Sequence, residues 1–225
     1  PWSSLVGAVR EARGLERIHL VSRLDRETSG VVVLAKHRRA ASLLQTAFAR
    51  RQTRKRYLAL LMGHLEEERT TESNLEKDPR SPVAVQQRIS FGGRGKAAVT
   101  HFKPLEYWGS CTLAEVVPET GRKHQIRAHA AWLGHPVAGD KIYGGDPSWY
   151  LEFIEQGWTD RLNRELRFHR QALHAAELEI RTEAGTHHFA APLPFEAEGF
   201  RRLAETGEAP ERPGTSTSKV TLFNL

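Results

Sequence analysis

The sequence predicts an α+β domain whose central sheet is mixed and mostly antiparallel. Apolar residues recur at three- and four-residue spacing in some segments, which indicates helices, while short apolar runs bounded by turn residues indicate strands. These helices and strands do not alternate regularly, as they would around a parallel sheet. A chain of 225 residues is long enough to bury a core of its own.

The N-terminal half should contain helices and two apolar strands. Residues 3–10 look amphipathic, and the run Val31–Leu34 indicates a buried strand. A helix follows over residues 37–51, and residues 57–62 form a second apolar run that ends at Gly63. Residues 64–96 are polar and contain breaker pairs, which predicts an exposed hairpin or loop. These pairs are Asp78-Pro79, Ser81-Pro82 and Gly92-Gly93.

The C-terminal half continues with strands over 97–102 and 111–117. A helix over 122–133 should end at Gly134, which suits a left-handed cap, with Pro136 just beyond it. The remaining expected elements are a partly helical insertion (146–170), a last hairpin (178–180 with 187–190) and a closing helix (194–204). We therefore expect a domain over 1–205 and a flexible tail over 206–225, much of it rich in Gly, Glu, Pro, Ser and Thr.

Composition favours a polyanionic partner. The formal net charge is +6, with 25 Arg against 8 Lys, and Arg is suited to phosphate contacts and to stacking on bases. A compositional bias toward Arg is the alternative explanation. The single cysteine, Cys111, excludes an intramolecular disulfide and suits a reducing cytoplasm. No apolar run approaches the length of a membrane span, and no signal peptide is recognisable.

The segment Arg23-Leu24-Asp25-Arg26-Glu27-Thr28-Ser29-Gly30 places one carboxylate between two arginines in a turn-like stretch. Nearby cations favour the charged form of a carboxylate, so Asp25 should stay ionised even if largely removed from water. An ionised, positioned Asp can act as a nucleophile or as a general base. The alternative is a structural cap in which Asp25 only forms a salt bridge with Arg26.

This segment resembles the catalytic motif of the RluA-type pseudouridine synthases, which isomerise uridine in structured RNA. Two further segments match that family in the same order: Arg54–Gly63, and Gly121–His129 continuing into Gly134–Gly144. The resemblance spans about residues 21–180 and implies the pseudouridine synthase fold, with a twisted sheet and an active cleft across its middle. The family's earlier Lys-Pro-x-Gly motif is absent, so we expect a fragment of the catalytic domain. Ser22 stands where family members usually carry His.

The resemblance implies roles for individual residues. Asp25 would be the essential carboxylate, and Tyr57 would lie against the target base as a candidate for proton transfer. Arg127 would form a buried ion pair with Asp25, and Ile126 would supply an apolar wall under the uracil. Without the resemblance, Tyr57 would be interpreted as a strand residue packed in the core. Arg127 would be interpreted as a solvated helix residue, and Ile126 as part of an apolar helix stripe in the core.

Substrate contacts are also expected. Arg23 would either enter the RNA helix in place of the flipped base or contact a phosphate. Residues 28–65 hold eight basic residues and no acid, which favours contact with the RNA backbone. The further expected substrate-binding residues are Arg26, Lys55, Arg122, His124 and Gln125.

We expect no cofactor and no metal. The spacing of His124, His129 and His135 matches neither the zinc-protease helix nor a zinc finger. The expected partner is ribosomal or transfer RNA, bound by a monomer. The alternatives are a non-catalytic RNA-binding or ribosome-assembly protein that retains the fold and, less favoured by the sequence, a metal-dependent nuclease.

Overall fold

The computed structural model describes residues 5–91, 93–194 and 196–208. Within these residues the main sheet has eight strands. Seven of them follow the order β10-β9-β4-β8-β7-β5-β6, and every pairing along this path is antiparallel. These strands are β4 (Thr53–Met62), β5 (Arg69–Lys77), β6 (Gln87–Ser90), β7 (Lys96–Trp108), β8 (Cys111–Pro118), β9 (Leu173–Thr182) and β10 (Gly185–Ala190). The eighth, β2 (Ser29–Gly30), pairs with β9 in parallel, so the sheet is mixed and mostly antiparallel, as predicted.

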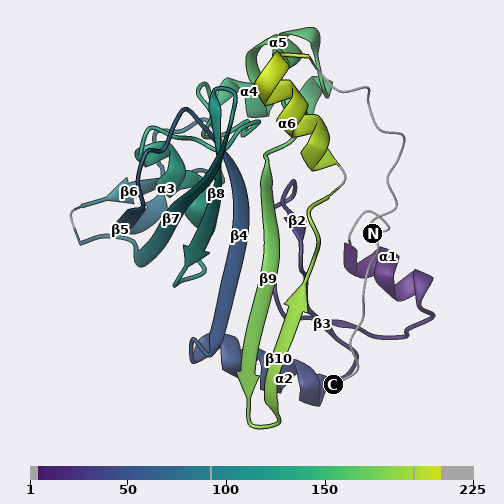
Figure 1. The fold of residues 1–225 in the computed structure, drawn as a ribbon. Coiled ribbons are helices and arrows are strands. Elements are labelled where there is room, and N and C mark those ends of the chain that lie inside the picture. Colours follow the sequence, from purple (N-terminus) through teal and green to yellow (C-terminus); the bar gives the residue numbers. More distant parts are fainter. Residues whose placement is uncertain (1–4, 92, 195, 209–225) are drawn as a thin grey trace.

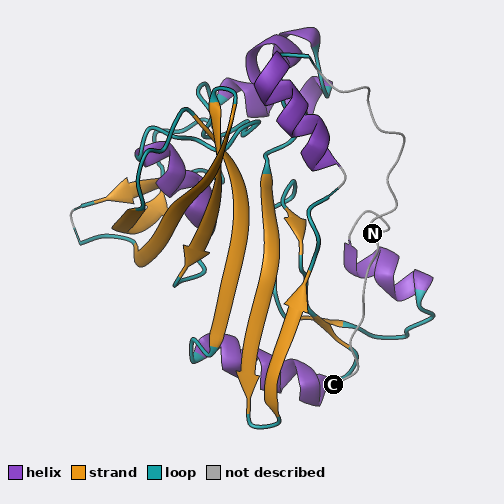
Figure 2. Ribbon diagram, viewed as in Figure 1, coloured by secondary structure: helices purple, strands orange, loops and turns teal. Residues whose placement is uncertain are grey.

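Helices lie around this twisted sheet (Figures 1 and 2). The helix α2 lies near the lower ends of β9 and β10, α3 lies among β6, β7 and β8, and α4 to α6 gather at the upper end (Figure 1). Their bounds are α1 (Leu5–Ala12), α2 (Arg38–Ala49), α3 (Gln125–Trp132), α4 (Ser148–Gln156), α5 (Asp160–Leu166) and α6 (Glu196–Thr206). No helix in the described part of the chain is long and apolar enough to cross a membrane.

The strand β4 divides the core because successive side chains point to opposite faces of the sheet. Ala59 and Leu61 belong to a cluster with α3, and Tyr57 packs against it. Leu60 faces the other way into a cluster that includes Phe200 of α6. This two-sided burial explains why the sequence shows an unbroken apolar run here, and it sets Tyr57 on the α3 side of the sheet.

The strand predicted over Val31–Leu34 is confirmed only at Leu34, which begins β3 (Leu34–Ala35). The segment joins two short pairings, β2 with β9 and β3 with β1 (His19–Leu20). Between them the Val31 N–H still donates to the Ala175 carbonyl, at 2.9 Å. Further on, the Val33 N–H donates to the Ser22 hydroxyl, also at 2.9 Å. Side-chain and loop hydrogen bonds therefore take the place of a continuous ladder, which an apolar run does not reveal.

Residues 64–96 were expected to form an exposed hairpin or loop. They form a hairpin, but part of it is buried. The strand β5 lies inside the sheet between β6 and β7. Leu65, Leu75 and Val83 are almost fully buried. Leu75 and Ile89 pack with Ala128 of α3, and Leu65 packs in the cluster that contains Ile126 of α3. Isolated apolar residues among many polar ones concealed that burial.

The remaining predicted elements are confirmed with changed bounds. The helix predicted from residue 122 begins at Gln125, because His124 adopts a left-handed φ of 53° immediately before it. Gly134 has φ of 82°, as its cap role requires. The insertion contains α4 and α5, and the last hairpin is β9 with β10. The closing helix α6 runs to Thr206, across the expected domain boundary, and most of the expected tail lies outside the described residues.

Candidate active site

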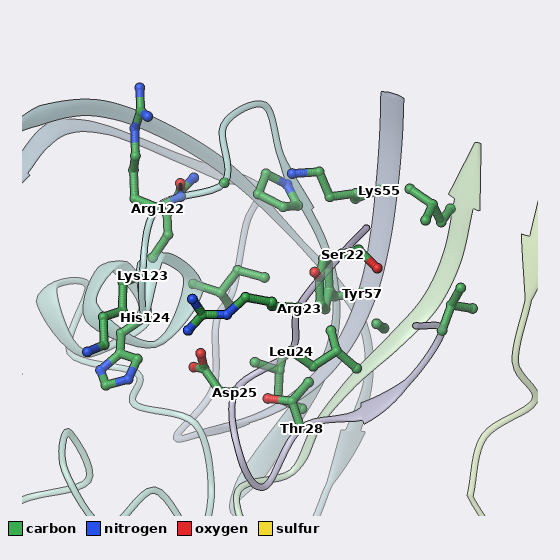
Figure 3. Close-up of a pocket in the computed structure, with 18 of the residues that line it drawn as sticks. Ser22, Arg23, Leu24, Asp25, Thr28, Lys55, Tyr57, Arg122, Lys123 and His124 are labelled. Carbon is green, nitrogen blue, oxygen red and sulfur yellow. Dashed lines mark hydrogen bonds between the residues drawn. The ribbon is translucent and has the colours of Figure 1, made fainter. Parts of the chain in front are cut away.

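A cleft of about 440 Å³ lies against the sheet where β4 and β9 run beside the loop before α3. Small-molecule sites commonly have volumes of about 300 to 1,000 Å³. Arg122, Lys123 and His124 stand on one side of the cleft, and Lys55 lies across it (Figure 3). Asp25 and Arg23 lie between these two sides in the same view. The cleft thus joins the three sequence segments that the motif analysis singled out.

The segment that carries Asp25 is anchored by the residues that follow it. The Thr28 N–H donates to the Asp25 carbonyl at 3.0 Å, and the Gln171 amide donates to the Thr28 hydroxyl at 2.6 Å. Ser29 hydrogen-bonds the His174 ring at 2.9 Å. Gly30 has φ of 113°, and a Cβ there would lie 2.2 Å from the carbonyl oxygen of Ala175. Thr, Ser and Gly are therefore the residues that fix the Asp25 turn against β9.

Arg127 connects Asp25 to a second, deeper carboxylate. Its Nη1 donates to Asp25 at 3.0 Å, while Nε and Nη2 donate to the two oxygens of Asp140 at 2.6 and 2.7 Å. Asp140 has no solvent exposure, whereas the Asp25 side chain is 27% exposed. Burial by itself would raise the pKa of Asp140, but Arg127 and two backbone N–H groups hold it below 3.8. The network presents one carboxylate to the cleft and keeps the other beneath it.

Aromatic and imidazole groups complete this network. The Arg127 guanidinium lies over the Tyr143 ring, 5.1 Å from its centre. The Tyr143 hydroxyl accepts the Gln87 N–H at 2.8 Å and hydrogen-bonds His124 at 3.0 Å. Burial, and then the charge of Arg127, lower the pKa of His124 to about 4, so its ring is neutral near pH 7.

Tyr57 and Ile126 form the apolar side of the cleft. Ile126 is 6% exposed, lines the cleft and also belongs to the core cluster around α3, so the core placement is confirmed and its place under the uracil stays a prediction. Burial, and then the negative charge of Asp25, raise the pKa of Tyr57 to about 12. The phenol therefore keeps its proton at neutral pH and can donate a hydrogen bond beside Asp25.

All the expected substrate-binding residues except Arg26 line the cleft. Arg23, Lys55 and Arg122 line the cleft, and burial together with Arg122 lowers the pKa of Lys55. Arg26 is exposed and lies outside the cleft lining, while the ion pair of Asp25 is made by Arg127.

Gln125 touches the cleft, but its side chain is engaged within the protein. Its oxygen accepts hydrogen bonds from the Thr120 hydroxyl and the Arg122 N–H, and its amide donates to Val99 and Thr100. These contacts hold the loop that precedes α3.

Sequence reasoning assigned no role to Asp140, Tyr143 or the Glu27–Lys141 pair. Lys141 is 2% exposed and donates to both oxygens of Glu27 at 2.8 and 2.9 Å. Its ammonium also lies over the Phe153 ring, 4.5 Å from the centre. The sequence did hold one indication of these contacts, because Asp140 and Lys141 adjoin an apolar stretch. Charged side chains that are buried need oppositely charged partners. No cluster of metal-binding side chains occurs among the described residues.

The fold places this site in a recognisable class. Human RNA Pseudouridylate Synthase Domain Containing 1 superposes with a TM-score of 0.71 and 30% identity, covering 85% of this chain and 75% of its own. Human RNA Pseudouridylate Synthase Domain Containing 4 gives 0.65 and 26%, covering 90% and 82%. The architecture is therefore that of the pseudouridine synthases.

Sequence comparison identifies the family. A family model described as RNA pseudouridylate synthase matches residues 5–132. The chain is 40% identical over 165 residues to ribosomal large subunit pseudouridine synthase D of Xylella fastidiosa, covering 73% of this chain and 47% of the relative. It is 33% identical over 199 residues to synthase C of Vibrio cholerae, covering 88% and 58%. The chain thus belongs to the RNA pseudouridylate synthase family, in its RluA-type branch, and spans about half the length of these curated relatives.

Proposed function

We propose that this protein isomerises specific uridines to pseudouridine in structured RNA, with Asp25 as the essential carboxylate. The observation that carries the proposal is the partly exposed Asp25 in a basic cleft, ion-paired at 3.0 Å to the buried Arg127. Large-subunit ribosomal RNA is the favoured substrate, because the relatives' names state that class. Transfer RNA is the other substrate to be tested, and we take the protein to act as a monomer.

The isomerisation breaks the N1–C1′ bond of uridine, turns the base and joins its C5 to C1′. The proton on C5 leaves and N1 gains one, so the reaction needs neither a redox step nor a metal. Asp25 acts at the sugar, either by adding to C1′ or by taking a sugar proton. Tyr57, which lines the cleft and stays protonated at neutral pH, is the candidate for exchanging the base protons. The apolar wall at Ile126 excludes water that would otherwise capture the sugar.

RNA has to deliver an unstacked base to this cleft. A base inside a helix is inaccessible, so the target nucleotide must leave its stack. Arg23 is exposed at the cleft, where its guanidinium can occupy the vacated position or hold a phosphate. Arg50, Arg51 and Arg54 are exposed close in sequence to the cleft residues Phe48 and Lys55, which supports backbone contacts. Binding should accordingly weaken steeply as salt rises.

The test is release of tritium from RNA carrying [5-³H]uridine. Parent protein, Asp25→Asn and Asp160→Asn are compared on unmodified ribosomal RNA and on transfer RNA, with RNA binding measured in parallel. Asp160 is an exposed carboxylate outside the cleft and serves as the matched control. We expect release by the parent and by Asp160→Asn and none by Asp25→Asn, with binding retained in all three. Binding without release by the parent would favour the non-catalytic RNA-binding alternative.

A further inference from the structure

The two most exposed large apolar side chains in the described part of the chain lie against each other. Phe91 is 74% exposed and Trp132 is 57% exposed, and their ring centres are 5.2 Å apart at an interplanar angle of 53°. Single exposed apolar residues are ordinary on protein surfaces, whereas a contiguous aromatic patch commonly marks a binding site. Trp132 is the last residue of α3, and Phe91 is the first residue after β6.

The surroundings of this pair are basic. The segments 91–105 and 120–139, which carry the two rings, contain no Asp or Glu. Arg94 and Lys96, just after Phe91, are exposed. The neighbouring acid Glu76 is already paired with Arg88, at 2.7 Å. An aromatic surface beside exposed cations complements an unpaired base and its phosphates.

The pair lies outside the cleft lining but shares α3 with it. Trp132 and the cleft residue Ile126 share α3, which rises about 1.5 Å per residue, so they are about 9 Å apart along the helix axis. The strand before Phe91 starts at Gln87, whose N–H donates to Tyr143 in the network beneath the cleft. A strand of RNA that places a base in the cleft therefore has neighbouring nucleotides within reach of the pair.

We propose that Phe91 and Trp132 form a stacking platform for an unpaired base of the RNA outside the target nucleotide, with Arg94 and Lys96 meeting the adjacent phosphates. Aromatic rings stack on any base, so the platform favours single-stranded over duplex RNA without reading sequence. This inference rests on the proposed function for its place in catalysis, but the binding that it predicts can be measured independently.

A second exposed ring pair supplies the control. Tyr107 is 53% exposed and lies 4.8 Å from the His64 ring, so it resembles Trp132 in exposure and contact. Its neighbours along the chain are acidic: Glu106 precedes it, and residues 66–68 beyond His64 are all Glu. Glu67 and Glu68 pair with Arg69 and Lys103, so the cations near this second pair are already neutralised, and it should not attract RNA.

The experiment measures binding of the 225-residue chain to a single-stranded oligouridylate of about 12 nucleotides and to an RNA duplex of the same length. The variants are Trp132→Ala, Trp132→Phe, Phe91→Ala and Tyr107→Ala, each checked for parental circular dichroism. We expect Trp132→Ala and Phe91→Ala to weaken single-strand binding by about 5- to 150-fold, the loss of one stacked base, and to leave duplex binding unchanged. Trp132→Phe keeps a ring and should restore binding, and Tyr107→Ala should bind like the parent.

Other results would overturn the inference. Parental single-strand binding by Trp132→Ala, or equal loss for single strand and duplex, would exclude a stacking role. A dimer that Trp132→Ala dissociates in sedimentation, with RNA binding unchanged, would assign the pair to contact between copies. Tritium release by the same proteins separates the two proposals. If Trp132→Ala releases tritium and binds RNA like the parent, only the stacking platform is excluded. If Trp132→Ala binds RNA more weakly but no protein, the parent included, releases tritium, only the isomerase is excluded.

Discussion

Asp140 is the residue whose loss should cost the most around the cleft. Its carboxylate is fully buried and accepts four hydrogen bonds, two from Arg127 and one each from the N–H groups of Ile142 and Tyr143. In Asp140→Asn the amide oxygen can keep three of these contacts, all made by one carboxylate oxygen. The new NH₂ group would then face the Arg127 Nε donor, where the present contact is 2.6 Å.

The expected loss of stability follows from this geometry. The Arg127 side chain is 6% exposed, so without Asp140 its charge is left with only the partly exposed Asp25 as counterion. Removing one partner of a buried ion pair costs about 3 to 5 kcal/mol, because the remaining charge stays desolvated. With a urea m-value of about 3 kcal/mol/M, the unfolding midpoint should fall by about 1 to 2 M.

Urea unfolding followed by circular dichroism measures this difference. Asp160→Asn removes an exposed charge at the N-terminus of α5 and should cost no more than about 1 kcal/mol. Asp140→Asn should also lose tritium release, since Arg127 no longer has a fixed position from which to hold Asp25. If Asp140→Asn is as stable as the parent, Arg127 does not depend on a buried counterion.

Three further outcomes are expected. Tyr57→Phe removes the neutral phenol beside Asp25 and should slow single-turnover tritium release by about 10²- to 10⁴-fold without weakening RNA binding; release at the parental rate would remove Tyr57 from proton transfer. Lys141→Met and Glu27→Gln should each lower the free energy of unfolding measured in urea. The double variant should lose about 1 to 3 kcal/mol less than the sum of the two single losses, because the two side chains interact. Additive losses would show that the pair is not coupled. The pKa of Asp140 is lowered below 3.8, so its contribution to stability is complete above about pH 4 and is lost as pH falls through the lowered value. Between about pH 5 and 2 the free energy of unfolding should therefore fall more steeply with pH for the parent than for Asp140→Asn. Equal slopes would contradict this.

Local sequence patterns predicted most elements of the fold because their periodicity matches one-sided burial. They failed where burial is supplied from far along the chain. The strand expected at Val31–Leu34 is divided between partners in β9 and β1, and the polar hairpin over 64–96 is buried through a few residues such as Leu75. Neither partner is visible in the local pattern.

The candidate site shows the same division. The motif containing Asp25 and the helix containing Arg127 could be found from sequence, and their contact at 3.0 Å agrees with the ion pair that the family resemblance implied. Asp140 received no role because its partner is known only once α3 and the following loop are folded together. Gln125 was expected to contact substrate, whereas four hydrogen bonds tie its side chain to the loop and to β7.

The most direct test of the central claim is the identity of the product. RNA incubated with the parent or with Asp25→Asn is digested to nucleosides and separated by chromatography. We expect the parent to convert uridine to pseudouridine and Asp25→Asn to leave uridine unchanged. Pseudouridine formation by Asp25→Asn would contradict the role of Asp25, and free uracil with abasic sugar from the parent would contradict a cleft that excludes water while C5 joins C1′.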